Sequence, residues 1–154
     1  MAIELREVTD EVREELRSVR VGEGQERFVS SVEESLAEAE LYPQAKPWFR
    51  AVYADGVAVG FVMISWDVEP DPPELWGPWF LWKLLIDERH QGQGYGKATL
   101  DLIVEYFRGR PGVEAMTTSA VPGEGSPVTF YERYGFVRTG EIHDGEIVLR
   151  LTIR

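Results

Sequence analysis

The chain has 154 residues, of which 44% are hydrophobic and 28% are charged, fractions typical of one folded domain spanning residues 1–154 and not of a disordered chain. Its net charge of -11 disfavours nucleic acid as a partner and suits a cationic one. The absence of cysteine excludes disulfides, thiolate zinc sites and cysteine nucleophiles, and with two histidines we expect no metal site.

The first third of the chain predicts one strand and two helices. Residues 3–8 alternate apolar and polar side chains, as a short strand does. Thr9 or Asp10 can cap a helix that runs to about Val19. A second helix, residues 25–40, carries an apolar stripe on one side. The members of this stripe are Phe28, Val29, Val32, Leu36 and Ala39.

The middle of the chain predicts a hairpin and then a central strand. Two β-rich runs flank the pair Asp55-Gly56, the composition that a tight hairpin turn requires. A proline-rich acidic loop, residues 67–78, follows them. Residues 79–87 read WFLWKLLID, a run too continuously apolar for a half-exposed strand. They predict a central strand that is covered on both faces.

The last part of the chain predicts two helices and three strands. A helix runs from about Tyr95 to Arg108, a strand covers residues 113–121, and a short helix covers residues 126–134. A closing hairpin turns at Asp144-Gly145. Because hairpins are mixed with a β-α-β crossover, we predict an α/β (α+β) fold. It has a mixed sheet of about seven strands with helices on both faces.

Residues 89–97, RHQGQGYGK, contain no acidic residue although the chain as a whole is strongly acidic. Glycines at alternate positions precede a helix, whose first N–H groups and dipole attract an anion. Glycine also lets a phosphate approach the backbone closely. The dinucleotide pattern G-x-G-x-x-G fails because Lys97 stands at its third glycine, and the triphosphatase loop fails as well. The alternative is a glycine-rich turn that only redirects the chain.

The pattern Q-x-x-G-x-G at residues 91–96 resembles the acyl-CoA pyrophosphate loop of the GNAT superfamily of N-acetyltransferases. FYERYGF, residues 130–136, is similar to the F-Y-x-x-x-G-F segment of that family. The spacing of the two motifs and the element order also suit the family, and the resemblance covers nearly the whole chain. Within the family, residues 81–100 and 118–141 look most like the bacterial spermine/spermidine (diamine) N-acetyltransferase branch.

This resemblance implies an acetyl-CoA-dependent acyltransferase with a GNAT-like fold. Main-chain N–H groups of residues 91–97 would hold the pyrophosphate, and Arg89 or Lys97 would add positive charge. Main-chain groups of Leu85 and Ile86 would hold the pantetheine arm as an added strand would. The implied cofactor-binding residues are Leu85, Ile86, Arg89, Gln91, Gly92, Gln93, Gly94, Tyr95, Gly96 and Lys97.

Tyr131 matches the family tyrosine that protonates the departing CoA thiolate. A phenol with a pKa of about 10 can pass its proton to a thiolate with a pKa of about 8.5 if the two are held in contact. The alternative is an aromatic side chain that fills the core at a helix-to-strand corner. The family often has asparagine seven residues earlier, where this chain has Glu124, so that cofactor contact departs from the family pattern.

The acceptor side must bind a cation and still release a proton. An alkylamine with a pKa of about 10.4 is protonated at pH 7, and deprotonating it costs roughly 4–5 kcal/mol. Acids set back from the reacting nitrogen could bind distal ammonium groups, and tryptophan rings could add cation–π contacts. A carboxylate could also act as the base through a water molecule, and the candidates for this role are Glu33, Glu34, Glu38 and Glu74. The proline-rich loop offers Asp67, Glu69, Asp71 and Glu74 for cations and Trp76 and Trp79 as rings. The candidate substrate-binding residues are Glu33, Glu34, Glu74 and Trp79. For each of them the alternative is an ordinary surface charge or a core aromatic.

We therefore predict transfer of an acetyl group from acetyl-CoA to a primary amine, with a polyamine such as spermidine or spermine as the best candidate. The nitrogen attacks directly in a ternary complex, since no cysteine can carry a thioester. The alternatives are another amine, such as a protein N-terminus or an aminoglycoside, or a non-catalytic acyl-CoA sensor module. We expect a cytoplasmic protein without a membrane partner, because no apolar run could span a bilayer and residues 1–15 lack a secretory core. The closing hairpin and helix faces could build a homodimer.

Overall fold

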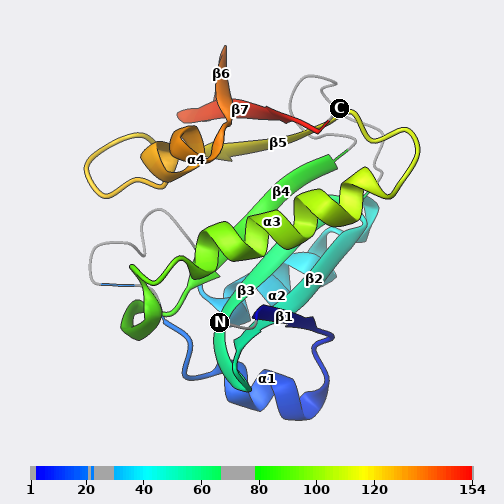
Figure 1. The fold of residues 1–154 in the computed structure, drawn as a ribbon, viewed down its shortest axis with the longest axis vertical. Coiled ribbons are helices and arrows are strands. Elements are labelled where there is room, and N and C mark those ends of the chain that lie inside the picture. Colours follow the sequence, from blue (N-terminus) through cyan, green and yellow to red (C-terminus); the bar gives the residue numbers. More distant parts are fainter. Residues whose placement is uncertain (1–2, 21, 23–29, 67–78, 154) are drawn as a thin grey trace.

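A computed structural model of the chain describes residues 3–20, 22, 30–66 and 79–153, and its strands form one mixed sheet (Figure 1). The strands are β1 (Ile3–Arg6), β2 (Pro47–Ala54), β3 (Val57–Trp66), β4 (Trp79–Ile86), β5 (Ala115–Ala120), β6 (Val137–His143) and β7 (Glu146–Thr152). Their order across the sheet is β1-β2-β3-β4-β5-β7-β6, and β4–β5 is the parallel pair. The predicted mixed seven-stranded α/β sheet and its element order are confirmed.

Helices cover both faces of this sheet (Figure 1). They are α1 (Asp10–Leu16), α2 (Val32–Leu41), α3 (Tyr95–Arg108) and α4 (Val128–Tyr134). Two separate apolar clusters fill the space between the helices and the sheet. One cluster joins α3 and α4 to the sheet through residues such as Leu100, Phe107 and Val128. The other joins α1 and α2 to the opposite face through residues such as Leu16 and Leu36.

The first two helices begin where serine or threonine caps them. Thr9 Oγ1 accepts a hydrogen bond from the N–H of Val12 at 3.2 Å, so α1 starts as predicted but ends at Leu16 instead of near Val19. Ser31 and Glu34 form a reciprocal capping box at the start of α2.

The prediction of one continuous helix over residues 25–40 is therefore wrong at its start, because the capping box fixes the first turn of α2 at Val32. Phe28 and Val29 of the predicted stripe lie outside the described residues. Its other members, Val32, Leu36 and Ala39, are buried as expected.

Both predicted hairpin turns have the backbone that their sequences require. Asp55 and Gly56 have φ angles of 50° and 82°, and Asp144 and Gly145 have φ angles of 49° and 79°. Positive φ at both central residues is the type I′ geometry, whose twist matches that of the strands on either side.

Strands β4 and β5 stay together for only two residue pairs. Phe80 lies opposite Thr117 and Leu81 lies opposite Thr118, and beyond these pairs the strands separate. Here the prediction of a strand covered on both faces is only half right. Residues 79–81 are buried, whereas residues 82–84 are half-buried, because β5 no longer lies beside them. The opening between β4 and β5 positions the candidate site.

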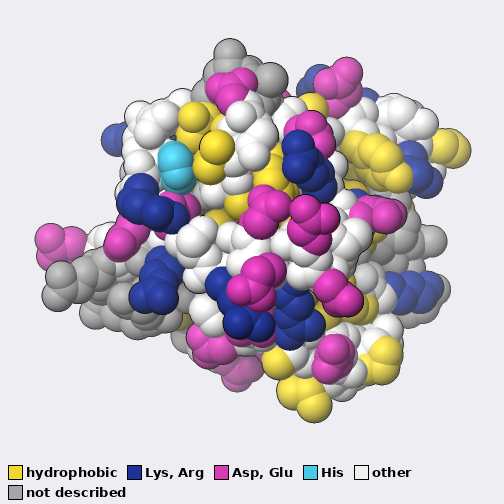
Figure 2. Space-filling view, turned by 90° about the horizontal axis from the view of Figure 1, so that it is seen from below, with side chains coloured by type: hydrophobic (Ala, Val, Ile, Leu, Met, Phe, Trp, Pro, Cys, Tyr) yellow, Lys and Arg dark blue, Asp and Glu magenta, His cyan; other side chains and the backbone are white. Residues whose placement is uncertain are grey.

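The surface around α1 mixes charges of both signs (Figure 2). Arg13 Nη2 lies 2.9 Å from Glu33 Oε2, and Arg17 Nε lies 3.2 Å from Glu14 Oε2. Several acidic side chains on this face are therefore paired with arginines. None of the helices in the described ranges is long and apolar enough to cross a bilayer.

Gly60 of β3 generates a prediction about the packing of β3 against β4, the strand that borders the opening to β5. A Cβ at this position would lie 2.5 Å from Leu85 O and 2.8 Å from Ile86 Cδ1, so Gly60→Ala forces β3 and β4 apart. We expect the free energy of unfolding to fall by about 1–3 kcal/mol in urea titrations. The matched control is Gly109→Ala at the exposed end of α3, where φ is -79° and the nearest atom is 3.5 Å away. The control should change stability by about 0.5 kcal/mol or less, and an equal loss in both variants would contradict the steric argument.

Candidate functional site

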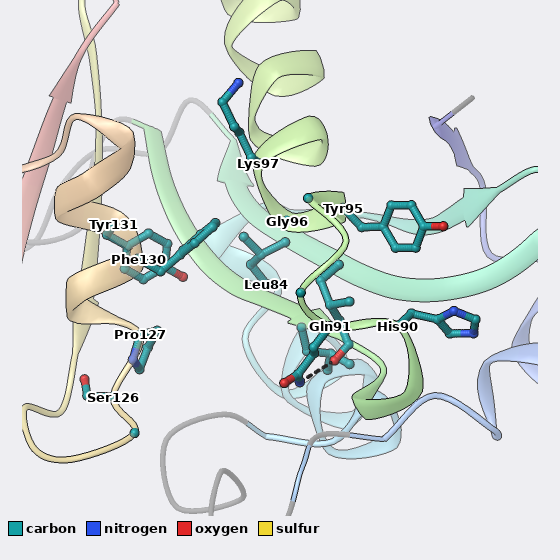
Figure 3. Close-up of a pocket in the computed structure, with 15 residues that line it drawn as sticks. Leu84, His90, Gln91, Tyr95, Gly96, Lys97, Ser126, Pro127, Phe130 and Tyr131 are labelled. Carbon is teal, nitrogen blue, oxygen red and sulfur yellow. Dashed lines mark hydrogen bonds between the residues drawn. The ribbon is translucent and has the colours of Figure 1, made fainter. Parts of the chain in front are cut away.

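A cavity of about 480 Å³ lies between the end of β4, the start of α3 and α4 (Figure 3). We call it the glycine-loop cavity. Its lining residues are Leu84, Leu85, Ile86, His90, Gln91, Gly92, Gly94, Tyr95, Gly96, Lys97, Gly125, Ser126, Pro127, Phe130 and Tyr131. The structure thus brings Leu85, Ile86, most of the 91–97 loop and Tyr131 to one place, although β4 and α4 are far apart in the sequence.

Two of the residues assigned to the cofactor do not line this cavity. Gln93 is exposed on the loop. Arg89 donates hydrogen bonds from Nε to Asp87 Oδ2 at 2.8 Å and from Nη2 to Ser18 O at 2.9 Å. Its guanidinium therefore ties the loop to the chain that follows α1.

Buried side chains and main-chain bonds hold the loop in shape. Asp87 is fully buried and accepts a hydrogen bond from the N–H of Arg20 at 2.9 Å as well as the one from Arg89. Gln91 Nε2 donates to Ile86 O at 2.9 Å, which folds the loop back onto the end of β4 (Figure 3). These contacts hold the start of the loop against β4 and the segment after α1, and the other end of the loop continues into α3.

Helix α3, all of which lies within the described residues, begins without a side-chain cap. Gly94 is the N-cap with φ of 82°, and the first turn contains Lys97 but no acidic residue. The first N–H groups of a helix have no intrahelical partner, and the helix dipole adds partial positive charge there. The start of α3 can therefore accept an external anion such as a phosphate.

Past Leu81, β4 has β3 on one side and the cavity on the other. Met63 lies opposite Lys83 and Ile64 lies opposite Leu81, so Trp82 is the extra residue of a bulge in β4. Bulges bend a strand and end its pairing, which is what the separation from β5 requires. Main-chain groups at the end of β4 can then pair with an extended guest as a strand would.

Tyr131 lies at the wall of the cavity nearest to β5. It is only 6% exposed, and its ring packs edge-on against Phe130 and Phe136 at centroid distances of 5.4 and 5.3 Å. Its hydroxyl points toward β4 (Figure 3). Burial raises the pKa of Tyr131 to about 12, and a hydrogen bond with the Thr118 side chain opposes this rise. The phenol therefore stays protonated at neutral pH and can donate a hydrogen bond into the opening.

A second cavity, of about 320 Å³, adjoins the first. Leu84, Pro127 and Tyr131 line both of them. The other lining residues of the second cavity are Glu38, Phe80, Trp82, Lys83, Thr118, Ser119, Ala120, His143, Asp144 and Glu146. We call it the carboxylate cavity after Glu38, Asp144 and Glu146. Tyr131 therefore stands where a hydrophobic-walled space meets an acidic one.

Polar contacts fix two of these carboxylates. Lys83 Nζ lies 3.2 Å from Glu38 Oε2 and donates a hydrogen bond to Ser30 Oγ at 2.9 Å. Ser119 Oγ donates to Glu146 Oε1 at 3.3 Å. The carboxylate of Glu38 is therefore neutralised by a lysine of the protein, whereas Glu146 receives only a neutral donor in this contact.

The predicted acceptor residues have different places in the structure. Glu38 lines the carboxylate cavity. Glu33 pairs with Arg13, whose hydrogen bond lowers the pKa of Glu33. Glu34 caps α2, and hydrogen bonds from Ser31 lower the pKa of Glu34. Neither Glu33 nor Glu34 lines the cavity.

The remaining predicted acceptor residues are Trp79, Trp76 and the acids of the proline-rich loop. Trp79 is buried, and its ring lies 5.4 Å from that of Phe107 in the core beneath α3. The others lie outside the described residues: Asp67, Glu69, Asp71, Glu74 and Trp76. Within those residues no group of three or more His, Cys, Asp or Glu side chains could hold a metal ion.

Sequence reasoning missed four charged or titratable residues of the carboxylate cavity: Lys83, His143, Asp144 and Glu146. Lys83 carries the one charge in the apolar run of β4, which is a detectable signal. Asp144 was interpreted only as a turn residue. His143 and Glu146 flank that turn and give no local signal of their own.

Comparisons with known proteins agree with this fold. The sequence profile of the Acetyltransferase (GNAT) family matches residues 8–136. A spermine/spermidine N(1)-acetyltransferase of Bacillus subtilis is 29% identical over 150 residues, which cover 97% of each chain. The crystal structure of PaiA N-acetyltransferase from Thermoplasma acidophilum, in complex with coenzyme A, superposes with a TM-score of 0.67 at 18% identity and covers 99% of both chains. An acetyltransferase from Thermus thermophilus superposes with a TM-score of 0.73 at 18% identity and covers 99% of this chain and 97% of its own.

Gly96 generates a prediction about the glycine-loop cavity. A Cβ here would lie 3.1 Å from Phe130 Cζ, so Gly96→Ala pushes this ring into the cavity. We expect coenzyme A to bind about tenfold more weakly in calorimetry, or ~1.4 kcal/mol. Because alanine favours helix over glycine, loss of α3 would not explain the result. Gly109→Ala at the other end of α3 should bind coenzyme A as the wild type does, and unchanged affinity in Gly96→Ala would refute the steric role of Phe130.

Proposed function

Because this chain belongs to the acetyltransferase (GNAT) family and is an acetyl-CoA-dependent N-acetyltransferase, we propose that its acceptor is a polyamine of the spermidine or spermine class. One feature carries the proposal: an acidic cavity adjoins the glycine-loop cavity at Tyr131. The curated relative that acetylates spermine and spermidine by name supports the same acceptor class.

On the cofactor side, we assign the pyrophosphate of acetyl-CoA to the main-chain N–H groups of the loop from Gln91 to Lys97. The uncapped start of α3, its glycines and the lack of acid in its first turn support this assignment. Lys97 adds positive charge there, although its Nζ also lies 3.1 Å from Asp101 Oδ2. We assign the pantetheine arm to the edge that β4 presents to the opening at Leu85 and Ile86. The Leu85 carbonyl points toward Gly60 of β3, so Ile86 is the residue whose main chain faces the opening.

Arg89 was expected to add positive charge at the pyrophosphate, but in this proposal it shapes the loop. Its side chain is engaged with Asp87 and Ser18. It therefore holds the loop in the binding conformation and does not itself contact the phosphates.

In the transfer step, the free amine attacks the thioester carbonyl carbon, a C–N bond forms and the C–S bond breaks. The nitrogen loses a proton to water, and the sulfur gains one from the Tyr131 hydroxyl. A phenol with a pKa of about 12 is a weak acid toward an ordinary thiolate. However, the burial that raises the pKa of Tyr131 also disfavours a thiolate held beside it, so the pKa of the sulfur rises with that of the phenol.

On the acceptor side, Asp144 and Glu146 are the carboxylates that we assign to the distal ammonium groups. Asp144 is exposed at the β6–β7 turn, and Glu146 is half-buried below it. Glu38 is already paired with Lys83 and offers less attraction to a second cation. A polyamine has several ammonium groups, so one of them can bind at the β6–β7 turn while the reacting nitrogen lies toward Tyr131.

Tyr131→Phe tests the catalytic assignment. Removing a general acid costs about 10²- to 10⁴-fold in rate, so we expect kcat in a thiol-release assay to fall by that order. The affinity for coenzyme A should stay the same, because the ring remains in place. Tyr106→Phe is the matched control, since this tyrosine of α3 is exposed and lines neither cavity. Wild-type turnover by Tyr131→Phe would remove Tyr131 from the mechanism.

Asp144→Asn and Glu146→Gln test the acceptor class. We expect each to lower kcat/KM for spermidine by about tenfold, the size of one charge-assisted contact. Turnover of butylamine, which has no distal ammonium, should change little. Glu105→Gln on the exposed face of α3 serves as the control carboxylate. The polyamine proposal is overturned if, in a panel of amines, only a peptide N-terminus or an aminoglycoside is acetylated.

A further inference from the structure

Lys83 places a positive charge inside the cavity to which we assign a cationic substrate. Its side chain is only 14% exposed, and its Nζ lies 3.2 Å from Glu38 Oε2 and 2.9 Å from Ser30 Oγ. A pocket built only to attract cations would not contain an ammonium of its own. The charge also interrupts an otherwise apolar strand, and burying a charge costs free energy even when it is paired.

The position of Lys83 follows from the bulge between β3 and β4. Consecutive residues of a regular strand point to opposite faces, but here both Trp82 and Lys83 meet α2 or its C-terminal end. The Trp82 ring lies 6.3 Å from that of Tyr42, and Lys83 pairs with Glu38. The next residue, Leu84, lines both cavities. Lys83 and Tyr131 line the same carboxylate cavity, so the anchored ammonium borders the space that reaches the junction at Tyr131.

The reacting nitrogen must be neutral when it reaches that junction, whereas the cavity binds the substrate as a cation. An alkylammonium must lose a proton before it can attack, and its ordinary pKa is about 10.4. A nearby like charge disfavours the charged form of a titrating group, and a nearby opposite charge favours it. Carboxylates beside the reacting nitrogen would thus hinder deprotonation, whereas a cation there would assist it.

We propose that the Lys83 ammonium favours the free-base form of the amine that binds beside it, and so prepares that nitrogen for attack. Lys83 is a positioning residue in this scheme, because it acts through the electrostatic field and forms no bond with the acetyl group. The inference rests on the proposed function, since it requires the carboxylate cavity to be the amine site.

The other charged and titratable groups around Lys83 divide the cavity into two ends. Glu38 on α2 pairs with Lys83, and Glu34 on the same helix is near enough for the Lys83 charge to lower its pKa. Tyr131 of α4 is the group at the junction. His143, Asp144 and Glu146 face the cavity from the β6–β7 hairpin. Asp144 and Glu146 are thus assigned to distal ammonium groups, and the lysine acts on the near one.

The test is the dependence of kcat on pH, measured at saturating spermidine. The rising part of this profile, its ascending limb, reports the pKa of the bound amine. In Lys83→Met the limb should move to higher pH by about one pH unit, the size of one close like charge. The rate at pH 7 then falls about tenfold, and the two profiles converge at high pH. Lys83→Arg keeps the charge and should keep the wild-type limb.

Glu38→Gln gives the opposite result if the inference is correct. It leaves the Lys83 charge uncompensated, so the limb should move to lower pH. The double variant Lys83→Met, Glu38→Gln removes both charges and should return the limb toward its wild-type position. A merely structural role for the ion pair predicts a pH-independent loss in all three variants, and that result overturns the inference. Melting temperatures and circular dichroism identify any variant that fails to fold.

A second measurement separates the bound amine from the titratable groups of the protein itself. A fluorinated primary amine of lower basicity should move the limb to lower pH by the difference in amine pKa. If the position of the ascending limb is the same for both amines, the limb reports a group of the protein, and that result overturns the inference. Failure of the proposed function is distinguishable, because it is a lack of spermidine turnover by the wild type. The same variants are then compared on whichever amine is acetylated.

Discussion

The separation of β4 from β5 is the constraint on which the rest of this structure depends. The two strands are parallel and pair over only two residues, at a point where Thr118 Oγ1 donates a hydrogen bond to Leu81 O at 2.9 Å. Beyond this point the sheet opens, and none of the seven described strands pairs with this edge of β4. Both cavities are built on it, and Tyr131 stands at their junction. A sheet that paired along its whole length would have no place for an extended cofactor arm.

The glycine loop depends on the same opening but is held from the other side. Asp87 is completely buried, yet it accepts hydrogen bonds from the Arg20 main chain and the Arg89 side chain. The N–H of Glu88 also donates to Arg20 O at 2.6 Å. The loop therefore takes its conformation from the segment after α1, so its amides need little further ordering when an anion binds. Preorganisation of this kind is how fixed dipoles bind charge efficiently.

Two opposite electrostatic demands meet in one acetyl-transfer reaction, and the fold separates them in space. The start of α3 attracts the negative pyrophosphate, and the β6–β7 hairpin carries the carboxylates that suit ammonium groups. Between them stand a neutral phenol, whose pKa is raised by burial, and a lysine paired with Glu38. This strongly acidic chain thus has no acidic residue in the glycine loop, and in its carboxylate cavity Lys83 compensates the charge of Glu38.

The sequence alone determined the elements, the hairpin turns and the two local motifs, because each depends on residues close together in the chain. Asp55-Gly56 and Asp144-Gly145 specify their turns through the φ angles they allow, and residues 91–97 and 130–136 carry their pattern at fixed spacing. Only the tertiary structure decided which charges share the acceptor cavity. Glu38, Lys83 and Glu146 come from a helix, a bulged strand and a hairpin, and no periodicity links them. The capping box that starts α2 lies within four residues, Ser31 to Glu34, and could have been read from the sequence. The half-buried state of residues 82–84 was decided by the tertiary structure, because β5 separates from β4 there.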